Sequence, residues 1–296
     1  MTDFRRHKKA LTRLQKALEG PSLFIHYSCE SFYDYSKPNS RRVTSIAVRM
    51  SDSSQTKSFS LHLTAERLSS LDQISEKLDL CERTMLEEFY EFVKAHQKAY
   101  KWLHWNMRDS NYGFEAIAHR YQVLGGSPHE IYEDQKLDLS PTLIEIYGKN
   151  YSGHPRIEWL VNENQIHKTA FLTGEEEANA FVAGNFVAMH QSTLVKVQAF
   201  SEIARLAADQ KLKTKSNIWI DVYGSSISSL GQAVAAHWVL VLLSFAIGAV
   251  SVVPALKHWF QEATSARSST KILPPASAPP EATSPPSKLI DTKKYR

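Results

Sequence analysis

An uncharged, apolar run between Ala233 and Leu256 limits the architecture of this 296-residue chain more than any other feature. No side chain from Trp238 to Leu256 is charged, and about 18 such residues are enough for a helix to cross the roughly 30 Å core of a bilayer. In a helix, Trp238 and Trp259 would lie roughly 31 Å apart, which suits two interfacial tryptophans. The pattern therefore predicts a single transmembrane helix over 233–256.

This predicted span divides the chain into parts of different composition. No continuous apolar h-region of a secretory signal lies near the N-terminus, so we expect a single-pass membrane protein with its N-terminal domain in the cytoplasm. Ser244 and Gly248 form a small-residue pair through which two such helices could self-associate in the bilayer. The expected parts are a basic amphipathic helix (1–20), a folded domain (21–212), a connector (213–232), the transmembrane helix (233–256) and a disordered Pro/Ser/Ala-rich tail (257–296).

Charge and cysteine content exclude few classes of function. A formal net charge of +4 is mild, and the two cysteines suggest neither a disulfide framework nor a zinc site. Near the N-terminus, Phe4, Leu11, Leu14 and Leu18 recur near helical spacing among basic residues. Such a helix could contact anionic lipid or nucleic acid, or it could pack on the domain through its one apolar stripe.

The order of predicted elements indicates an α/β domain. Buried or alternating apolar patterns predict strands at 22–31, 42–50, 57–63 and 99–105. Helical patterns follow at 82–96 and 113–124, and the second half is helical throughout, with Ser140 as a cap and a capping box at Thr173. Gly184 is a possible break in the long helical stretch from 175 to 210.

Four stretches taken in this order resemble the DEDD family of 3′–5′ exonucleases, which have a ribonuclease H-like fold. The stretches are SLFIHYSCES (22–31), KWLHWNMRDSNYGFEAIAHRY (101–121), KLDLSPTLIEIYG (136–148) and FVAMHQSTLVKVQAF (186–200). The resemblance implies a ribonuclease H-like mixed sheet flanked by helices, a helical second half and, with the predicted span, one C-terminal transmembrane helix.

The resemblance also implies a site for two divalent cations, Mg²⁺ or Mn²⁺, held by carboxylates from separate elements. Its positions here would give Glu30, Asp109 and His190 as catalytic residues, with Glu30 and Asp109 as metal ligands. The sequence departs from the pattern, because Ser28 stands where the first acid is expected and Val195 where the last one is. Asp34, Asp138 or one of the glutamates at 175–177 could compensate only if the fold brings them in.

Contacts to nucleic acid are expected from the second motif. The stretch from 104 to 113 mixes aromatic rings with amides and an arginine, a combination that can stack on and hydrogen-bond a nucleotide. We name Asn106, Arg108 and Arg120 as nucleic-acid-binding candidates. The same loop could be an ordinary interface, and Arg120 could serve only in a salt bridge.

These observations give one leading function and two alternatives. The leading prediction is a membrane-anchored, exonuclease-like protein that is catalytically impaired and binds single-stranded nucleic acid or a protein. One alternative is an active metal-dependent 3′–5′ exonuclease tethered to the membrane. The other is a membrane-anchored scaffold with no role in nucleic-acid binding.

Overall fold

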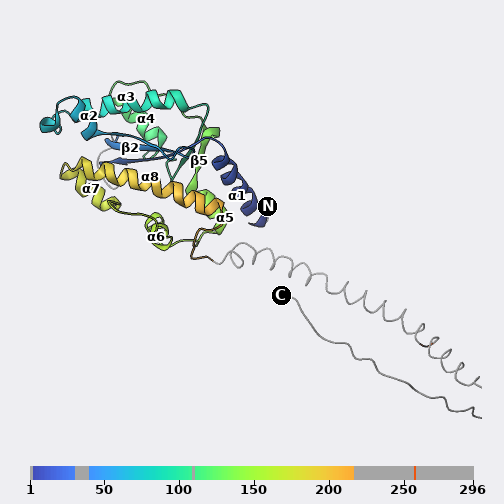
Figure 1. The fold of residues 1–296 in the computed structure, drawn as a ribbon. Coiled ribbons are helices and arrows are strands. Elements are labelled where there is room, and N and C mark those ends of the chain that lie inside the picture. Colours follow the sequence, from blue (N-terminus) through green and yellow to red (C-terminus); the bar gives the residue numbers. More distant parts are fainter. Residues whose placement is uncertain (1–2, 31–39, 109–110, 217–256, 258–296) are drawn as a thin grey trace, which may run out of the picture. The chain divides into compact units, whose positions relative to one another are not determined.

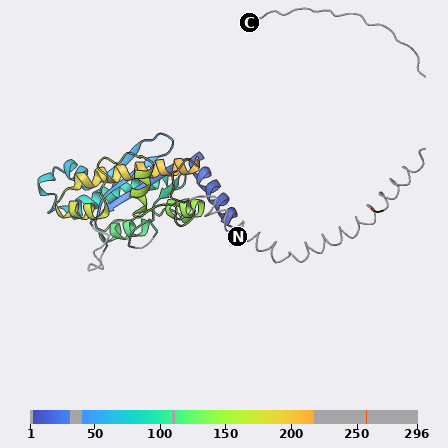
Figure 2. The same ribbon diagram turned by 90° about the horizontal axis from the view of Figure 1, so that it is seen from below.

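A computed structural model describes residues 3–30, 40–108, 111–216 and 257. The part before residue 217 is an α/β domain in which one sheet lies between two layers of helices (Figure 1). The helices α3 and α4 cover one face, and α5, α7 and α8 cover the other. Seen from below, α8 runs along the length of the sheet (Figure 2).

The sheet has five strands in the order β3-β2-β1-β4-β5. The strand β1 is central, pairing antiparallel with β2 on one side and parallel with β4 on the other. The outer strands continue this pattern, with β3 antiparallel to β2 and β5 parallel to β4. The strands are β1 (Ser22–Cys29), β2 (Val43–Met50), β3 (Thr56–Ser60), β4 (Lys101–His104) and β5 (Lys136–Asp138).

The α-helices are α1 (Asp3–Glu19), α2 (Leu61–Arg67), α3 (Leu78–His96), α4 (Phe114–Val123), α5 (Leu139–Tyr147), α6 (Arg156–Glu163), α7 (Gly174–Val182) and α8 (Phe186–Ala208). Two 3₁₀ turns, η1 (Leu71–Gln73) and η2 (Glu133–Gln135), lie in connections. The first helix packs on α5 and α8 through Ala10, Leu14 and Ala17, all buried. This contact agrees with the expectation that the apolar stripe of α1 binds the domain.

The alternation of β1 separates two hydrophobic cores, because neighbouring residues of a strand point to opposite faces. Phe24 belongs to the core beneath α1, α5 and α8, and its neighbour Ile25 belongs to the core beneath α3 and α4. His26 and Ser28 share the face of Phe24, which is the α8 face. The position of a residue in β1 therefore decides which layer of helices it contacts.

Most local predictions are confirmed, with specific exceptions. The capping box at Thr173 is present, and Gly184, with a φ of 69°, separates α7 from α8. The third predicted strand ends earlier than expected, because Leu61 begins α2 after Ser60. The predicted cap Ser140 is instead the second residue of α5, and Asp138 caps the helix by accepting a bond from its backbone N–H.

The predicted fold class included a transmembrane helix, and that part is corrected. Among the residues that the structure describes, no helix is both long and apolar enough to cross a membrane. The predicted span at 233–256 lies outside the described residues, as does the tail apart from Lys257. The fold class supported by the described residues is a mixed five-stranded sheet flanked by helices. The predicted single-pass membrane location with a cytoplasmic N-terminal domain is corrected by the same finding.

Candidate functional site

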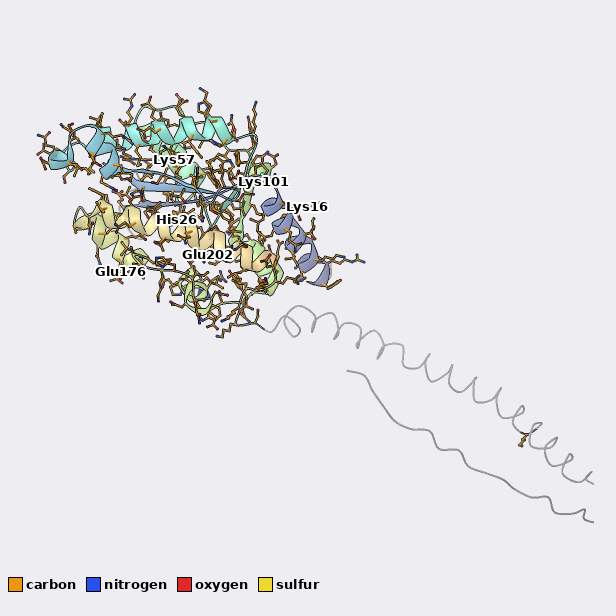
Figure 3. The ribbon with its side chains drawn as sticks, in the orientation of Figure 1. Lys16, His26, Lys57, Lys101, Glu176 and Glu202 are labelled. Carbon is orange, nitrogen blue, oxygen red and sulfur yellow. The ribbon has the colours of Figure 1, made fainter. Side chains whose placement is uncertain are left out.

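A pocket of about 790 Å³ opens at the carboxyl end of β4, on the α8 face of the sheet. The segment after β4 supplies Trp105, Asn106 and Arg108, β1 supplies His26, and α8 supplies Lys196 and Phe200. The first turn of α6 supplies Arg156, Ile157 and Glu158, α7 supplies Gly174, and the connections supply Arg41, Asn111, Tyr112, His154, Pro155 and Phe171. In Figure 3, His26 lies between the sheet and α8, at the inner wall of this pocket.

The pocket wall carries an excess of positive charge. Its cationic side chains are Arg41, Arg108, Arg156 and Lys196, whereas Glu158 is the acidic residue in the lining. Arg108 is held by Asp138, with its Nε 2.6 Å from a carboxylate oxygen. The first turn of α6 begins at Arg156 in the same wall, and the positive end of a helix dipole favours an anion there.

Aromatic rings stand beside these cations. Phe200 is buried against the ring of His26 at a centroid distance of 5.3 Å and against Trp105 at 5.8 Å. Phe171 lies on the other side of Lys196, whose Nζ is 5.1 Å from the centroid of the ring. A wall that combines cations with aromatic faces suits a planar ligand that carries negative charge, such as a nucleotide.

His26 lines this pocket with a ring that is almost fully buried. Its Nδ1 is 3.3 Å from the hydroxyl of Tyr112, while its Nε2 has no hydrogen-bond partner among the described residues. Burial, and to a lesser degree the nearby Lys196, lowers the pKa of His26 well below its usual value. The ring is therefore neutral near pH 7 and can donate or accept one hydrogen bond at Nε2.

Beneath the pocket, Glu177 and Lys196 form a buried ion pair that joins α7 to α8. The Lys196 Nζ is 2.8 Å from Oε1 of Glu177, and both side chains are more than nine-tenths buried. The same oxygen accepts hydrogen bonds from the hydroxyls of Ser28 and Ser192, each at 2.9 Å. Thr193 completes the network, lying 2.8 Å from Ser28 and 2.6 Å from Ser45.

This network determines whether the site can bind a divalent metal ion. Mg²⁺ and Mn²⁺ require oxygen ligands, several of them charged, around one point. Here Glu177 is the carboxylate beside Ser28, and the ammonium of Lys196 already neutralises its charge at Oε1. The described residues contain no group of three or more His, Cys, Asp or Glu side chains arranged to hold a metal ion. The donor set at Ser28 does not fit a two-cation centre.

The structure brings two of the predicted residues into the pocket. Asn106 and Arg108 both line it, and Nη2 of Arg108 donates to the side-chain oxygen of Asn106 at 3.3 Å. Asn106 adopts a left-handed backbone with a φ of 54°, a conformation that asparagine tolerates better than most residues. Asp109 lies outside the described residues, so its predicted roles as catalytic residue and metal ligand have no described geometry.

The other predicted residues lie elsewhere. Glu30 follows the end of β1, where its backbone N–H donates to Arg42, and its side chain is not in the pocket wall. His190 is buried on α8 with its ring 5.0 Å from that of His62 on α2. Arg120 binds Glu82 and Asp79 on α3, which is the alternative salt-bridge role.

Comparison of the chain with family models, with curated proteins and with solved structures gives no match. The function must therefore be inferred from the geometry of this pocket and from the residues that line it. The resemblance to DEDD exonucleases accordingly stays a hypothesis.

Three residues of the site were missed or left open by the sequence. Glu177 was one of three candidate glutamates, and only the contact between α7 and β1 singles it out. Lys196 comes one residue after the position where the family pattern places an acid, so the motif gave no reason to choose it. Arg156 carries the one available sequence signal, because it follows Pro155 at the start of a helix.

Replacing Glu177 with alanine is expected to lower the free energy of unfolding by about 1–3 kcal/mol, because Lys196 and two hydroxyls lose their buried acceptor. Chemical denaturation measures the change. Glu175→Ala, an exposed neighbour on α7, should change stability by less than about 0.5 kcal/mol. Equal effects of the two substitutions would contradict a structural role for the ion pair.

Proposed function

We propose that this domain is an exonuclease-like binding module that holds a nucleotide of single-stranded nucleic acid without cleaving it. The observation that carries the proposal is the Glu177–Lys196 pair bonded to Ser28, beneath a cationic and aromatic pocket. The resemblance to DEDD exonucleases places the first metal-binding acid at this point of β1. In this chain a hydroxyl and a neutralised carboxylate stand there instead.

The contacts of the pocket suggest how a nucleotide would be held. Its phosphate would bind Arg156 and the first turn of α6, since both offer donors and positive charge. Its base would lie against Phe171, a partly exposed ring of the pocket wall, where stacking contributes about 1–3 kcal/mol per base. Each of these interactions forms without a metal ion.

Binding of a fluorescently labelled single-stranded oligonucleotide to the full chain tests the proposal. We expect binding in the presence of EDTA and no shortening of the oligonucleotide after Mg²⁺ or Mn²⁺ is added. The Arg156→Gln substitution should weaken binding roughly tenfold, because a charge-assisted hydrogen bond is lost. The Arg205→Gln substitution is a matched control, since Arg205 is exposed on α8 and does not line the pocket.

Three results would count against this function. Absence of oligonucleotide binding in EDTA would contradict the proposal that the domain is a binding module. An equal loss of affinity in the Arg156 and Arg205 variants would show that the oligonucleotide does not bind in this pocket. Shortening of the oligonucleotide with Mg²⁺ would instead favour the active nuclease. That outcome would point to a catalytic role for Asp109, which lies outside the described residues.

A further inference from the structure

A second cationic surface lies away from this pocket, between α1 and the outer strand β5. It is a groove of about 680 Å³ whose walls come from α1 on one side and from the start of β4 and β5 on the other. We refer to it as the α1 groove. Its basic lining residues are Arg5, Lys8, Lys9, Arg13, Lys16, Lys101 and Lys136, and its acidic residue is Asp134.

Four of these cations have no anionic partner among the described residues. Arg5, Lys8, Lys9 and Lys16 are exposed on α1 and form no ion pair there. Their positions follow helical spacing, so they form one stripe about 16 Å long on the side of α1 that faces the groove. Arg13, by contrast, is paired with Glu145.

The opposite wall adds two lysines at the amino ends of neighbouring strands. Lys101 begins β4 and Lys136 begins β5, and the two strands are paired. Lys101 donates to the backbone carbonyl of Asp134, whereas Lys136 pairs with Glu133 and its ammonium lies 5.1 Å from the ring centroid of Phe114, so the charge of this wall comes mainly from Lys101. Figure 3 shows Lys16 and Lys101 at the same end of the domain.

From this arrangement we infer that the α1 groove binds the phosphate backbone of the same single-stranded nucleic acid, beyond the nucleotide held in the pocket. This inference rests on the proposed function. Charge complementarity supports it, because a concave stripe of cations follows the path of a flexible polyanion. The groove and the pocket lie at opposite ends of the paired strands β4 and β5, with the groove at their amino ends and the pocket at the carboxyl end of β4.

The packing of α1 favours nucleic acid over a membrane surface as the occupant. A helix that lies in a bilayer interface inserts its apolar face between the lipids. In α1 that face is already covered, because Ala10, Leu14 and Ala17 are buried against the domain. The face left to solvent carries mainly cations, with Phe4 as a large exposed hydrophobic residue at its start, and it forms one wall of a groove, not a flat surface.

The test compares a short oligonucleotide of about four nucleotides with one of about fifteen, a length that can occupy both sites. The full chain should bind the longer one more tightly. The double variant Lys9→Gln and Lys16→Gln should weaken binding of the longer oligonucleotide on the order of tenfold and reduce the salt dependence of log K by about 1.4. Binding of the short oligonucleotide should stay unchanged.

The matched control is Lys57→Gln with Lys94→Gln, two exposed lysines on β3 and α3. The strand β3 forms the edge of the sheet opposite β5, so this pair removes equal charge away from the groove. Equal losses in the two double variants, or no gain in affinity with length, would overturn the inference. Loss of binding to anionic lipid vesicles in the α1 variant, with oligonucleotide binding unchanged, would also overturn it. Failure of the short oligonucleotide to bind the unmodified chain would instead contradict the proposed function.

Discussion

Lowering the pH from 7 to 5 is expected to destabilise the folded domain by about 6 kcal/mol, because three histidines are buried in their neutral form. The residues are His26, His104 and His190. Burial is the main cause in each case: it lowers the pKa of His104 to about 3 and that of His190 to about 4, and it holds the pKa of His26 well below its usual value.

The direction of this change in stability follows from the number of protons bound in the folded and unfolded states. Unfolded histidines take up protons below about pH 6.5, and the folded ones do not until a much lower pH. The unfolded state therefore binds more protons in this range, and each histidine contributes about 2 kcal/mol of lost stability by pH 5. Glu82 and Asp138 affect stability in the opposite direction, because burial raises the pKa of each carboxyl group and the folded state then binds more protons there than the unfolded state. Their contribution to stability changes mainly near the acid end of the range.

Urea denaturation at constant ionic strength, repeated between pH 7 and 5, measures this effect. The His190→Gln substitution should reduce the loss of stability between pH 7 and 5 by about 2 kcal/mol, which is the contribution of one histidine. The matched substitution His119→Gln should leave the dependence unchanged, because His119 is exposed on α4. Constant stability over this range would show that protons reach the three rings in the folded state.

The second large effect is expected from Glu82, whose replacement with alanine should lower the free energy of unfolding by about 3–5 kcal/mol. Glu82 is fully buried and joins three elements. Its carboxylate accepts from Arg120 at 2.6 and 2.9 Å, from Arg42 at 2.7 Å and from the backbone N–H of Val43 at 2.7 Å. Without it, two guanidinium groups lose their buried counter-charge.

Asp79 provides the matched control for Glu82, since it binds the same two arginines at 2.7 and 3.0 Å. Its side chain is 70% exposed, so water can replace most of the interaction with the two arginines when Asp79 is removed. Asp79→Ala should therefore cost less than about 1 kcal/mol. Thermal and chemical denaturation of both variants give the comparison. A cost for Asp79→Ala that equals the cost for Glu82→Ala would show that burial does not set the strength of this cluster.

The sequence predicted those elements whose signals are local. The hydrophobic face of α3, the capping box at Thr173 and the break at Gly184 each depend on residues within a few positions. It missed β5, because Lys136–Asp138 is a strand only through its pairing with β4. It extended β3 too far, because the alternation of Leu61 and Leu63 is also compatible with the first turn of a helix.

The site was harder to predict because its contacts join distant segments. Ser28 was singled out by its place in a motif, but its partners Glu177 and Thr193 are 149 and 165 residues away. The family pattern also directed attention to acids, whereas the residue that meets Glu177 is Lys196, a base. The family motif specifies carboxylates that bind metal ions. It therefore gives no signal for a lysine that takes the place of the metal ion. Only the packing of α7 and α8 on β1 identifies it.

The corner at Gly184 has a consequence for the order in which the domain assembles. It turns the chain so that α7 and α8 pack together, and the ion pair between them joins residues only 19 positions apart. Contacts of short sequence separation form early in folding, because little chain entropy is lost in closing the loop. We therefore expect the α7–α8 hairpin to establish its internal charge pair first, so that β1 docks Ser28 onto an already neutralised carboxylate.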